Sequence, residues 1–189
     1  MLYNLVLFLH IIGTVIMFIA VGMTLTAMVA MLHTKNNESL REWSSLAVKL
    51  DGLLPFSVIL VLFPGLYLVF STWGWEKAWV NFSLAALILM TVMGPIINLP
   101  RLKLILKTVN EERGSIPSAE IRAKVMDRTL WNSVLIMTML LVGILFLMTV
   151  KTGMIGSVVT LAATAFLGIF AANLLLKRAV AIGSKKTAA

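Results

Sequence analysis

Five long runs of apolar residues divide the chain, and most polar and charged residues lie between them. A run of about 20 mainly apolar residues can cross the hydrocarbon core of a bilayer as a helix. The pattern therefore predicts a single-domain, all-α integral membrane bundle of five transmembrane helices. The predicted spans are Tyr3–Leu32, Leu53–Thr72, Trp79–Leu99, Leu130–Val150 and Met154–Leu176.

Two of the connections carry an apolar pattern of their own. In residues 38–50 and again after Pro100, apolar residues recur at helical spacing among charged ones. We expect the first segment to form an amphipathic helix on the membrane surface. In residues 101–128 we expect the third span to continue past a break at Pro100, and a further helix to start at Pro117–Ser118. The apolar positions are Leu40, Trp43, Leu46, Ala47, Leu50, Leu102, Ile105, Leu106 and Val109.

The basic residues are distributed very unevenly between the connections. Fourteen of the 16 lysines and arginines fall in the first and third connections and after the last span, and the other two are Lys77 and Lys151. By the positive-inside rule, the N-terminus lies outside and the C-terminus in the cytoplasm. We therefore expect a multi-pass protein of the bacterial cytoplasmic (inner) membrane. Its basic side would contact anionic lipid headgroups.

Composition supports this interpretation and excludes several others. The chain is 60% hydrophobic and 13% charged, with a mean hydropathy of +0.99, whereas soluble domains are about 45–50% apolar and about 25% charged. The net charge is +8, but the basic residues lie between the predicted membrane spans, so the charge does not indicate a nucleic-acid partner. The chain has no cysteine, which excludes thiolate chemistry, iron–sulfur clusters and covalently attached haem. The first run is too long for a signal peptide and has no basic residue ahead of it, so it is expected to stay in the mature chain.

His10 is the only side chain within the five predicted spans that can become charged near neutral pH. Ionisable residues inside a membrane are candidates for function, because their burial costs free energy without a partner. At 1.5 Å per residue, His10 lies about 10 Å below the outer surface. Counting inward along the other spans places Tyr67, Asn81 and Ser83 at a similar depth.

Several roles for His10 follow from the residues alone. It can be a neutral side chain that hydrogen-bonds between helices, an axial ligand of haem b, or part of a permeation path. The last is weakest, since ion-coupled carriers usually use a buried carboxylate. Methionine pairs suggest copper, but methionine is also a flexible core filler. The only other imidazole, His33, is predicted at the inner end of the first span, as an interfacial residue or a haem ligand.

Small and aromatic residues mark two further features. Small residues let membrane helices approach closely, either within the bundle or in a homo-oligomer. Tryptophans between the second and third spans are typical of an aromatic belt at the headgroup level. The small residues are Gly13, Ala20 and Ala27 on the first span and Ala165, Gly168 and Ala172 on the fifth, and the tryptophans are Trp73, Trp75 and Trp79.

The stretch Phe8–Val15, which reads FLHIIGTV, resembles the first helix of the HemJ-type protoporphyrinogen oxidases and of CopD-like membrane proteins. The chain as a whole is similar to a family of bacterial predicted integral membrane proteins with this layout. The resemblance implies that His10 binds haem b. In the HemJ-type pattern the third helix carries Trp-x-His-x-Lys, whereas residues 79–83 here place Asn81 and Ser83 at the histidine and lysine positions. The resemblance therefore implies binding through His10, with Tyr67, Asn81 and Ser83 as neighbours, and no assigned reaction. The alternative is a non-catalytic membrane subunit or small-molecule permease in which His10 is structural.

Overall fold

Every regular element in the described part of the chain is helical. The computed structural model describes residues 1–187, with side chains through residue 181. No strand occurs among these residues, and five helical segments are long and apolar enough to cross a membrane. The predicted all-α class with five spanning helices is confirmed. The α-helices are α1 (Leu2–His33), α2 (Asn37–Asp51), α3 (Leu54–Leu68), α4 (Ala78–Met93), α5 (Leu99–Glu111), α6 (Ala119–Val125), α7 (Arg128–Val150) and α8 (Met154–Thr187), and the π-helices are η1 (Val69–Trp73) and η2 (Gly94–Asn98).

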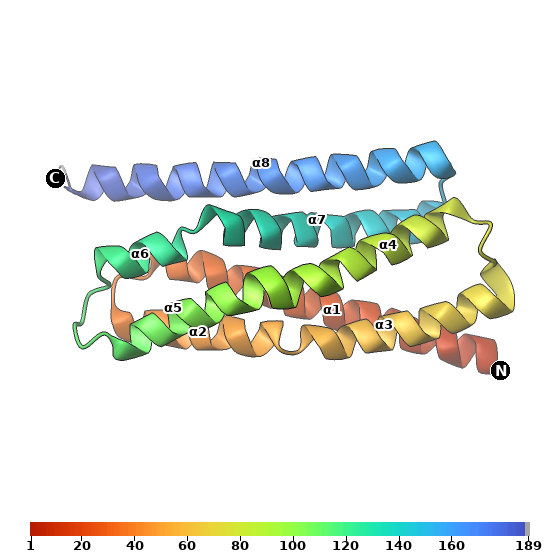
Figure 1. Cartoon of the computed structure of the whole chain (residues 1–189), viewed down its shortest axis with the longest axis horizontal. Helices are drawn as coiled ribbons and strands as arrows, with labels where there is room; N and C mark the ends of the chain where they lie inside the picture. Colours follow the sequence, from red (N-terminus) through yellow and green to blue (C-terminus); the bar gives the residue numbers. More distant parts are fainter. Residues whose placement is uncertain (188–189) are drawn as a thin grey trace.

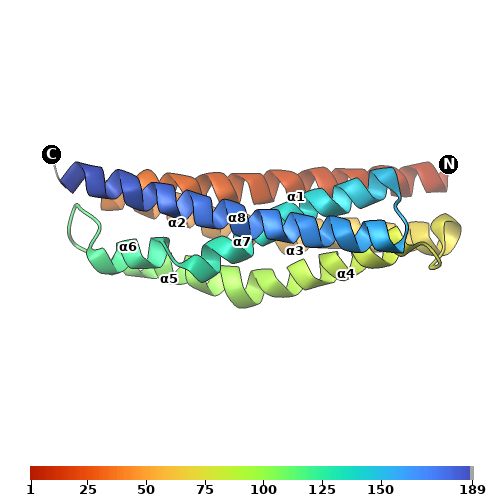
Figure 2. The same ribbon diagram turned by 90° about the horizontal axis from the view of Figure 1, so that it is seen from above.

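The helices lie along one long axis, with the two termini at opposite ends of the bundle (Figure 1). We call these the N-terminal end and the C-terminal end. The first also holds the α3–α4 and α7–α8 connections, and the second holds the α5–α6 connection. α1 packs against α2 and α3, while α8 packs along α7. Figure 2, turned by 90°, shows α1 and α4 on opposite flanks of α8.

Large exposed apolar side chains cover only part of α1, where they run from Leu2 to Met23, whereas on α8 they continue to Val180. In the second span they begin at Leu53, and in the third they continue through Ile96 in η2, with Leu104 beyond it. This band is the surface suited to the hydrocarbon core, which is about 30 Å thick. At 1.5 Å per residue, a helix as long as α1 measures about 48 Å. The C-terminal end of the bundle therefore extends beyond the band.

Beyond the band, the helices build a protein core of their own. The buried residues of this core come from α1, α2, α5, α6, α7 and α8. In α2, Leu40, Ala47 and Leu50 are buried. The predicted helix in residues 38–50 is present, but its apolar face lies against protein, which corrects the expectation of a helix lying on the membrane surface. The physical reason is that α1, α5 and α2 all continue past the membrane band and cover one another.

Two π-helices carry the spans past their prolines. Pro64 lies inside α3, which continues into η1 and ends at Gly74, where φ is 76°. Pro95 lies in η2, which joins α4 to α5. Pro100 lies in the first turn of α5, directly after η2, and the helical conformation continues through it. The expected break at Pro100 is therefore wrong, and the change in helical geometry lies at η2.

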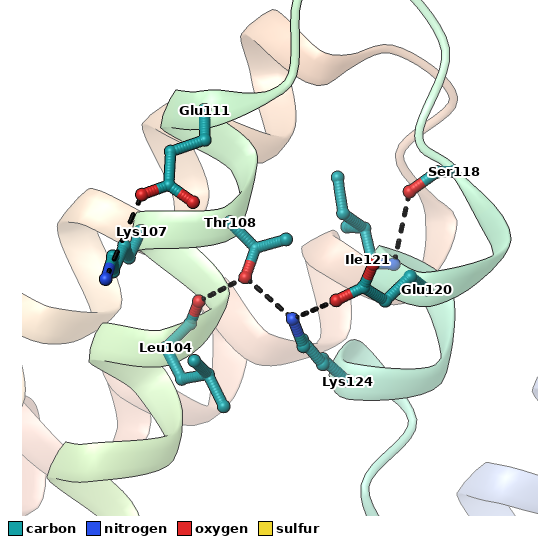
Figure 3. A network of polar contacts seen from close by, with 8 residues as sticks. All are labelled: Leu104, Lys107, Thr108, Glu111, Ser118, Glu120, Ile121 and Lys124. Carbon is teal, nitrogen blue, oxygen red and sulfur yellow. Dashed lines mark hydrogen bonds and ion pairs between the residues drawn. The ribbon is translucent and has the colours of Figure 1, made fainter.

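A polar network fixes α6 to α5 at the C-terminal end (Figure 3). The Lys124 ammonium donates to Glu120 Oε1 at 2.6 Å and to Thr108 Oγ1 at 2.9 Å. Ser118 caps α6 by accepting from the Ile121 N–H. These contacts hold the predicted helix after Pro117–Ser118 against the third span.

Candidate functional site

His10 joins α1 to α3 through a single hydrogen bond. The side chain is 9% exposed, and its Nδ1 lies 2.8 Å from the carbonyl oxygen of Val61. Val61 lies just before Pro64, which interrupts the hydrogen-bond ladder of α3. The histidine is therefore bonded to the backbone of a neighbouring helix near an irregular point in that helix.

This bond fixes which nitrogen of His10 carries the proton. A carbonyl oxygen can only accept, so Nδ1 must donate its N–H. In the neutral imidazole, Nε2 then keeps its lone pair. Histidines that ligate metals commonly donate their other ring N–H to a carbonyl or carboxylate in the same way. The arrangement suits Nε2 to act as a ligand or a hydrogen-bond acceptor.

Two residues of the second span shape the space around the imidazole. A Cβ built at Gly65 would lie 3.0 Å from His10 Cε1 and 3.1 Å from Nδ1, so a side chain larger than glycine would press on the ring. On another side, Trp73 meets the imidazole in a T-shaped contact with ring centroids 6.2 Å apart. The ring is thus held in position by contacts from both α3 and η1.

His10 lines a cavity of about 610 Å³ in the half of the bundle near the N-terminus. This volume lies within the range of about 300–1,000 Å³ that is typical of small-molecule sites. The walls come from α1, α3, η1, α4 and α7 and are mostly apolar. The polar side chains among them are those of Tyr3, His10, Thr14, Ser83, Thr149 and Lys151.

Ser83 differs from the two threonines of this wall. Thr14 and Thr149 donate to carbonyl oxygens of their own helices, at 2.9 Å in each case. Ser83 is 1% exposed, and its Oγ has no hydrogen-bond partner. A buried hydroxyl group without a protein partner is available to hydrogen-bond a water molecule or a ligand. The cavity therefore offers both an imidazole nitrogen and a hydroxyl group to an occupant.

The structure brings together only two of the four residues predicted for this site. His10 and Ser83 share the cavity. Tyr67 is 40% exposed and does not line it, and Asn81 instead donates to the carbonyl oxygen of Trp75 at 2.8 Å. Counting residues gives depth in the membrane but not direction around the helix axis. Tyr67 and Asn81 were chosen because their predicted depth matches that of His10, but neither side chain lines the cavity.

The other candidate ligands lie away from the cavity or in cores. His33 is exposed and its Nδ1 lies 2.9 Å from the Val29 carbonyl of its own helix. Met28 and Met31 pack in the core of the C-terminal end, as expected of methionine filling irregular space. Among the described residues, no group of three or more His, Asp or Glu side chains is placed to hold a metal ion.

Sequence reasoning did not find two residues of the site. Trp73 was expected in an aromatic belt, but it lines the cavity and packs on Trp79, which is 6% exposed. Trp75, at 40% exposed, is the one of the three whose exposure fits a belt. Lys151 was counted only as a charge in a loop. No local sequence pattern marks Lys151, because its place at the cavity depends on how the helices pack.

Comparison with protein-family models, with curated proteins and with solved structures found no match.

Proposed function

We propose that this multi-pass membrane protein binds haem b in the cavity, with Nε2 of His10 as an axial ligand of the iron. One observation carries the proposal. His10 donates Nδ1–H to the Val61 carbonyl, which leaves the Nε2 lone pair available on a side chain that lines a ligand-sized apolar cavity. Histidine is the commonest proximal ligand of haem iron.

The remaining residues of the wall fit such a group. Haem presents a broad apolar surface, and most of the lining is aliphatic or aromatic. Met17 and Met148 also line the cavity, and a methionine thioether would be able to help hold the iron. When bound, haem supplies electron transfer or the binding of a small gaseous ligand. The proposal assigns no further reaction.

The residues of this chain would hold and orient the group. The Val61 carbonyl sets the tautomer of His10, and Gly65 leaves room for the ring. The apolar walls exclude water, which strengthens polar interactions inside the cavity. These roles need no titratable group beyond His10.

The visible spectrum of the purified protein tests this proposal. Full-length protein in detergent is titrated with haemin, and we expect a shifted Soret band in the wild type and in His33→Ala. His33 is the matched control, since it lies on the same helix away from the cavity. In His10→Ala the band should lose its ligand-dependent shift, and imidazole added to His10→Gly should restore it. A wild type with no Soret shift, or a shift unchanged in His10→Ala, would refute haem ligation by His10.

The competing proposal is a membrane subunit or permease in which His10 is a structural link. The observation in its favour is the same 2.8 Å bond, since it joins α1 to α3. Hydrogen bonds between membrane helices contribute about 0.6 kcal/mol on average and at most about 2 kcal/mol. Under this proposal His10→Ala lowers the thermal unfolding midpoint and the wild type takes up no haem.

The orientation and lipid contacts are proposed from charge. The α1–α2 and α5–α6 connections, with α2, α5 and α6, carry most of the basic residues and lie at the C-terminal end of the bundle. The positive-inside rule then puts that end in the bacterial cytoplasm, against the anionic headgroups of the inner leaflet. The cavity would open near the outer side.

A further inference from the structure

The residue that ends α7, Lys151, has an uncommon backbone conformation. Its φ is 56° and its ψ is 51°, and among the described residues it is the only non-glycine residue with a positive φ. Its N–H caps the helix by donating to the Leu147 carbonyl at 2.9 Å. Glycine or asparagine usually occupies this left-handed capping position. The cap therefore needs the backbone of this residue but not a lysine side chain.

Lys151 lines the cavity at an exposed position. Its Nζ lies 5.8 Å from the ring centroid of Trp79, and Lys151 lines the cavity together with His10 and Ser83. The ring centroids of Trp79 and Trp73 are 5.3 Å apart, and Trp73 in turn contacts His10. Two indoles thus lie between the imidazole and the ammonium. An occupant of the cavity can meet an apolar surface with a nitrogen lone pair at one side and a positive charge at the other.

This positive charge has no acidic partner in the structure. The ion pairs in the described part of the chain involve Arg101, Lys107 and Lys124, and none involves Lys151. Its cation–π contact with Trp79 orients the ammonium but leaves its charge unneutralised. A carboxylate on an occupant would form a charge-assisted contact here.

The cavity is open to the membrane side of the bundle. Four of its apolar lining residues are between 44% and 55% exposed, so they form a rim that faces outward between α1 and α7. These are Ile11, Val15, Ile19 and Leu145. A compound dissolved in the bilayer can reach the cavity through this rim.

We propose that Lys151 is the counter-ion for a carboxylate of a membrane-soluble, amphipathic ligand, of which a porphyrin with propionate groups is the leading class. The proposal rests on the proposed haem function and adds the residue that binds the carboxylate groups of the porphyrin. The Ser83 hydroxyl, which is buried without a hydrogen-bond partner among the described residues, lies one helical turn from Trp79 and supplies a second polar contact. Lys151 is a binding residue in this role, and no reaction step is assigned to it.

Metal-free protoporphyrin and its dimethyl ester test the role of Lys151, because neither probe depends on iron ligation. Binding to full-length protein in detergent is followed by quenching of tryptophan fluorescence, since Trp73 lines the cavity. Lys151→Asn is the chosen variant, because asparagine tolerates the left-handed conformation and preserves the cap. Lys77→Asn is the matched control, because this lysine lies directly before α4 in the α3–α4 connection and does not line the cavity.

We expect wild type and Lys77→Asn to bind the diacid about tenfold more tightly than the diester. In Lys151→Asn the affinity for the diacid should fall about tenfold, while that for the diester stays unchanged. Equal loss for both probes, or no loss for either, would overturn the proposal.

The haemin titration separates the two proposals. Diacid selectivity that depends on Lys151, without a Soret shift that depends on His10, would uphold the counter-ion and reject haem ligation. A Soret shift that depends on His10, without diacid selectivity, would uphold ligation and reject the counter-ion. A wild type that binds none of the probes would reject both.

Discussion

At the scale of single residues, the site depends on how closely His10 is fitted. Its ring is bonded to Val61, sits against Gly65 and meets the edge of Trp73. Gly65 is the residue with the least tolerance, because a Cβ there would lie 3.0 Å from the imidazole. The constraint at Gly65 is the lack of space for a side chain, and not a backbone conformation that only glycine adopts.

Gly65→Ala should therefore displace the imidazole and weaken the bond to Val61. We expect destabilisation of about 1–3 kcal/mol, as for other overpacked sites, and a weaker Soret response to haemin. Thermal unfolding and the haemin titration measure the two effects. Gly22→Ala on α1 is the control, since a Cβ built there meets no atom within 4 Å, and helix propensity favours alanine by about 0.5–1 kcal/mol. If Gly65→Ala behaved like Gly22→Ala, the close fit of His10 would be wrong.

Ser83→Ala should separate stability from binding. The Ser83 hydroxyl is buried without a partner, and an unsatisfied buried group costs about 1–3 kcal/mol. Its removal should leave the unfolding midpoint of the ligand-free protein unchanged or raise it, while porphyrin affinity falls. Thr91→Val on the same helix is the control, because Thr91 already donates to the Leu87 carbonyl at 2.8 Å. A large loss of stability in Ser83→Ala would mean that the hydroxyl has a structural partner.

Residue-level prediction from the sequence succeeded in part. His10 stood out because no other ionisable side chain lies inside the predicted spans. Ser83 was found by depth, and it does share the cavity. Tyr67 and Asn81 were chosen by the same count and lie elsewhere, because depth along a helix does not fix the face that a side chain occupies. Lys151 was missed because its role depends on how α7 and α4 pack, which no local pattern reveals.

At the scale of helices, small residues determine which pairs lie close together. On α8, a Cβ built at Gly168 would lie 2.7 Å from backbone atoms of Leu135 and Ile136. On α1, a Cβ at Gly13 would meet the backbone of Leu60 at 2.8 Å. The predicted small-residue faces are used within the bundle at these two positions. Close approach of this kind is the main source of attraction between membrane helices.

Gly168→Leu should push α8 away from α7. Because the obstructing atoms are backbone, the helices must separate, and we expect a loss of at least about 1–3 kcal/mol. Phe170→Leu is the matched control. It introduces the same residue two positions along α8, where the native phenylalanine is 58% exposed. The thermal unfolding midpoint in detergent should fall for Gly168→Leu only. Equal midpoints would contradict the close packing of these two helices.

Helices were easier to predict than their surroundings. The five spans follow from apolar runs, and the helical spacing in residues 38–50 correctly predicted α2. An amphipathic helix needs a cover for its apolar face, and a membrane surface and a protein core satisfy that need equally well. The local pattern cannot distinguish them, so the burial of Leu40 and Ala47 against other helices was not foreseen. The same limit applies to η2, whose π geometry has no clear sequence signal.

At the scale of the whole molecule, an odd number of spans separates the two termini. The termini lie at opposite ends of the bundle (Figure 1). The cavity is near the N-terminal end, and the core formed by α2, α5 and α6 is at the other. The protein therefore has two unlike regions, a cavity within the exposed apolar band and a buried protein core beyond it.

The proposed orientation can be tested with single cysteines, because the chain has none of its own. Glu76→Cys lies in the α3–α4 connection and Asn110→Cys near the end of α5. In intact cells we expect a membrane-impermeant maleimide to label Glu76→Cys, and to label Asn110→Cys only after permeabilisation. The reverse pattern would invert the topology, and a reporter fused after Lys186 should agree with whichever pattern is found.

Continuity of α1 gives this arrangement a mechanical consequence. α3 and α4 each pass into a π-helix within the bundle, whereas α1 is one uninterrupted α-helix. It carries His10 in the cavity and Met28 in the far core, about 27 Å apart at 1.5 Å per residue. An uninterrupted helix can transmit a tilt at one end to its other end. Any tilt of α1 on filling the cavity would shift the surface on which α2 rests, on the opposite side of the membrane.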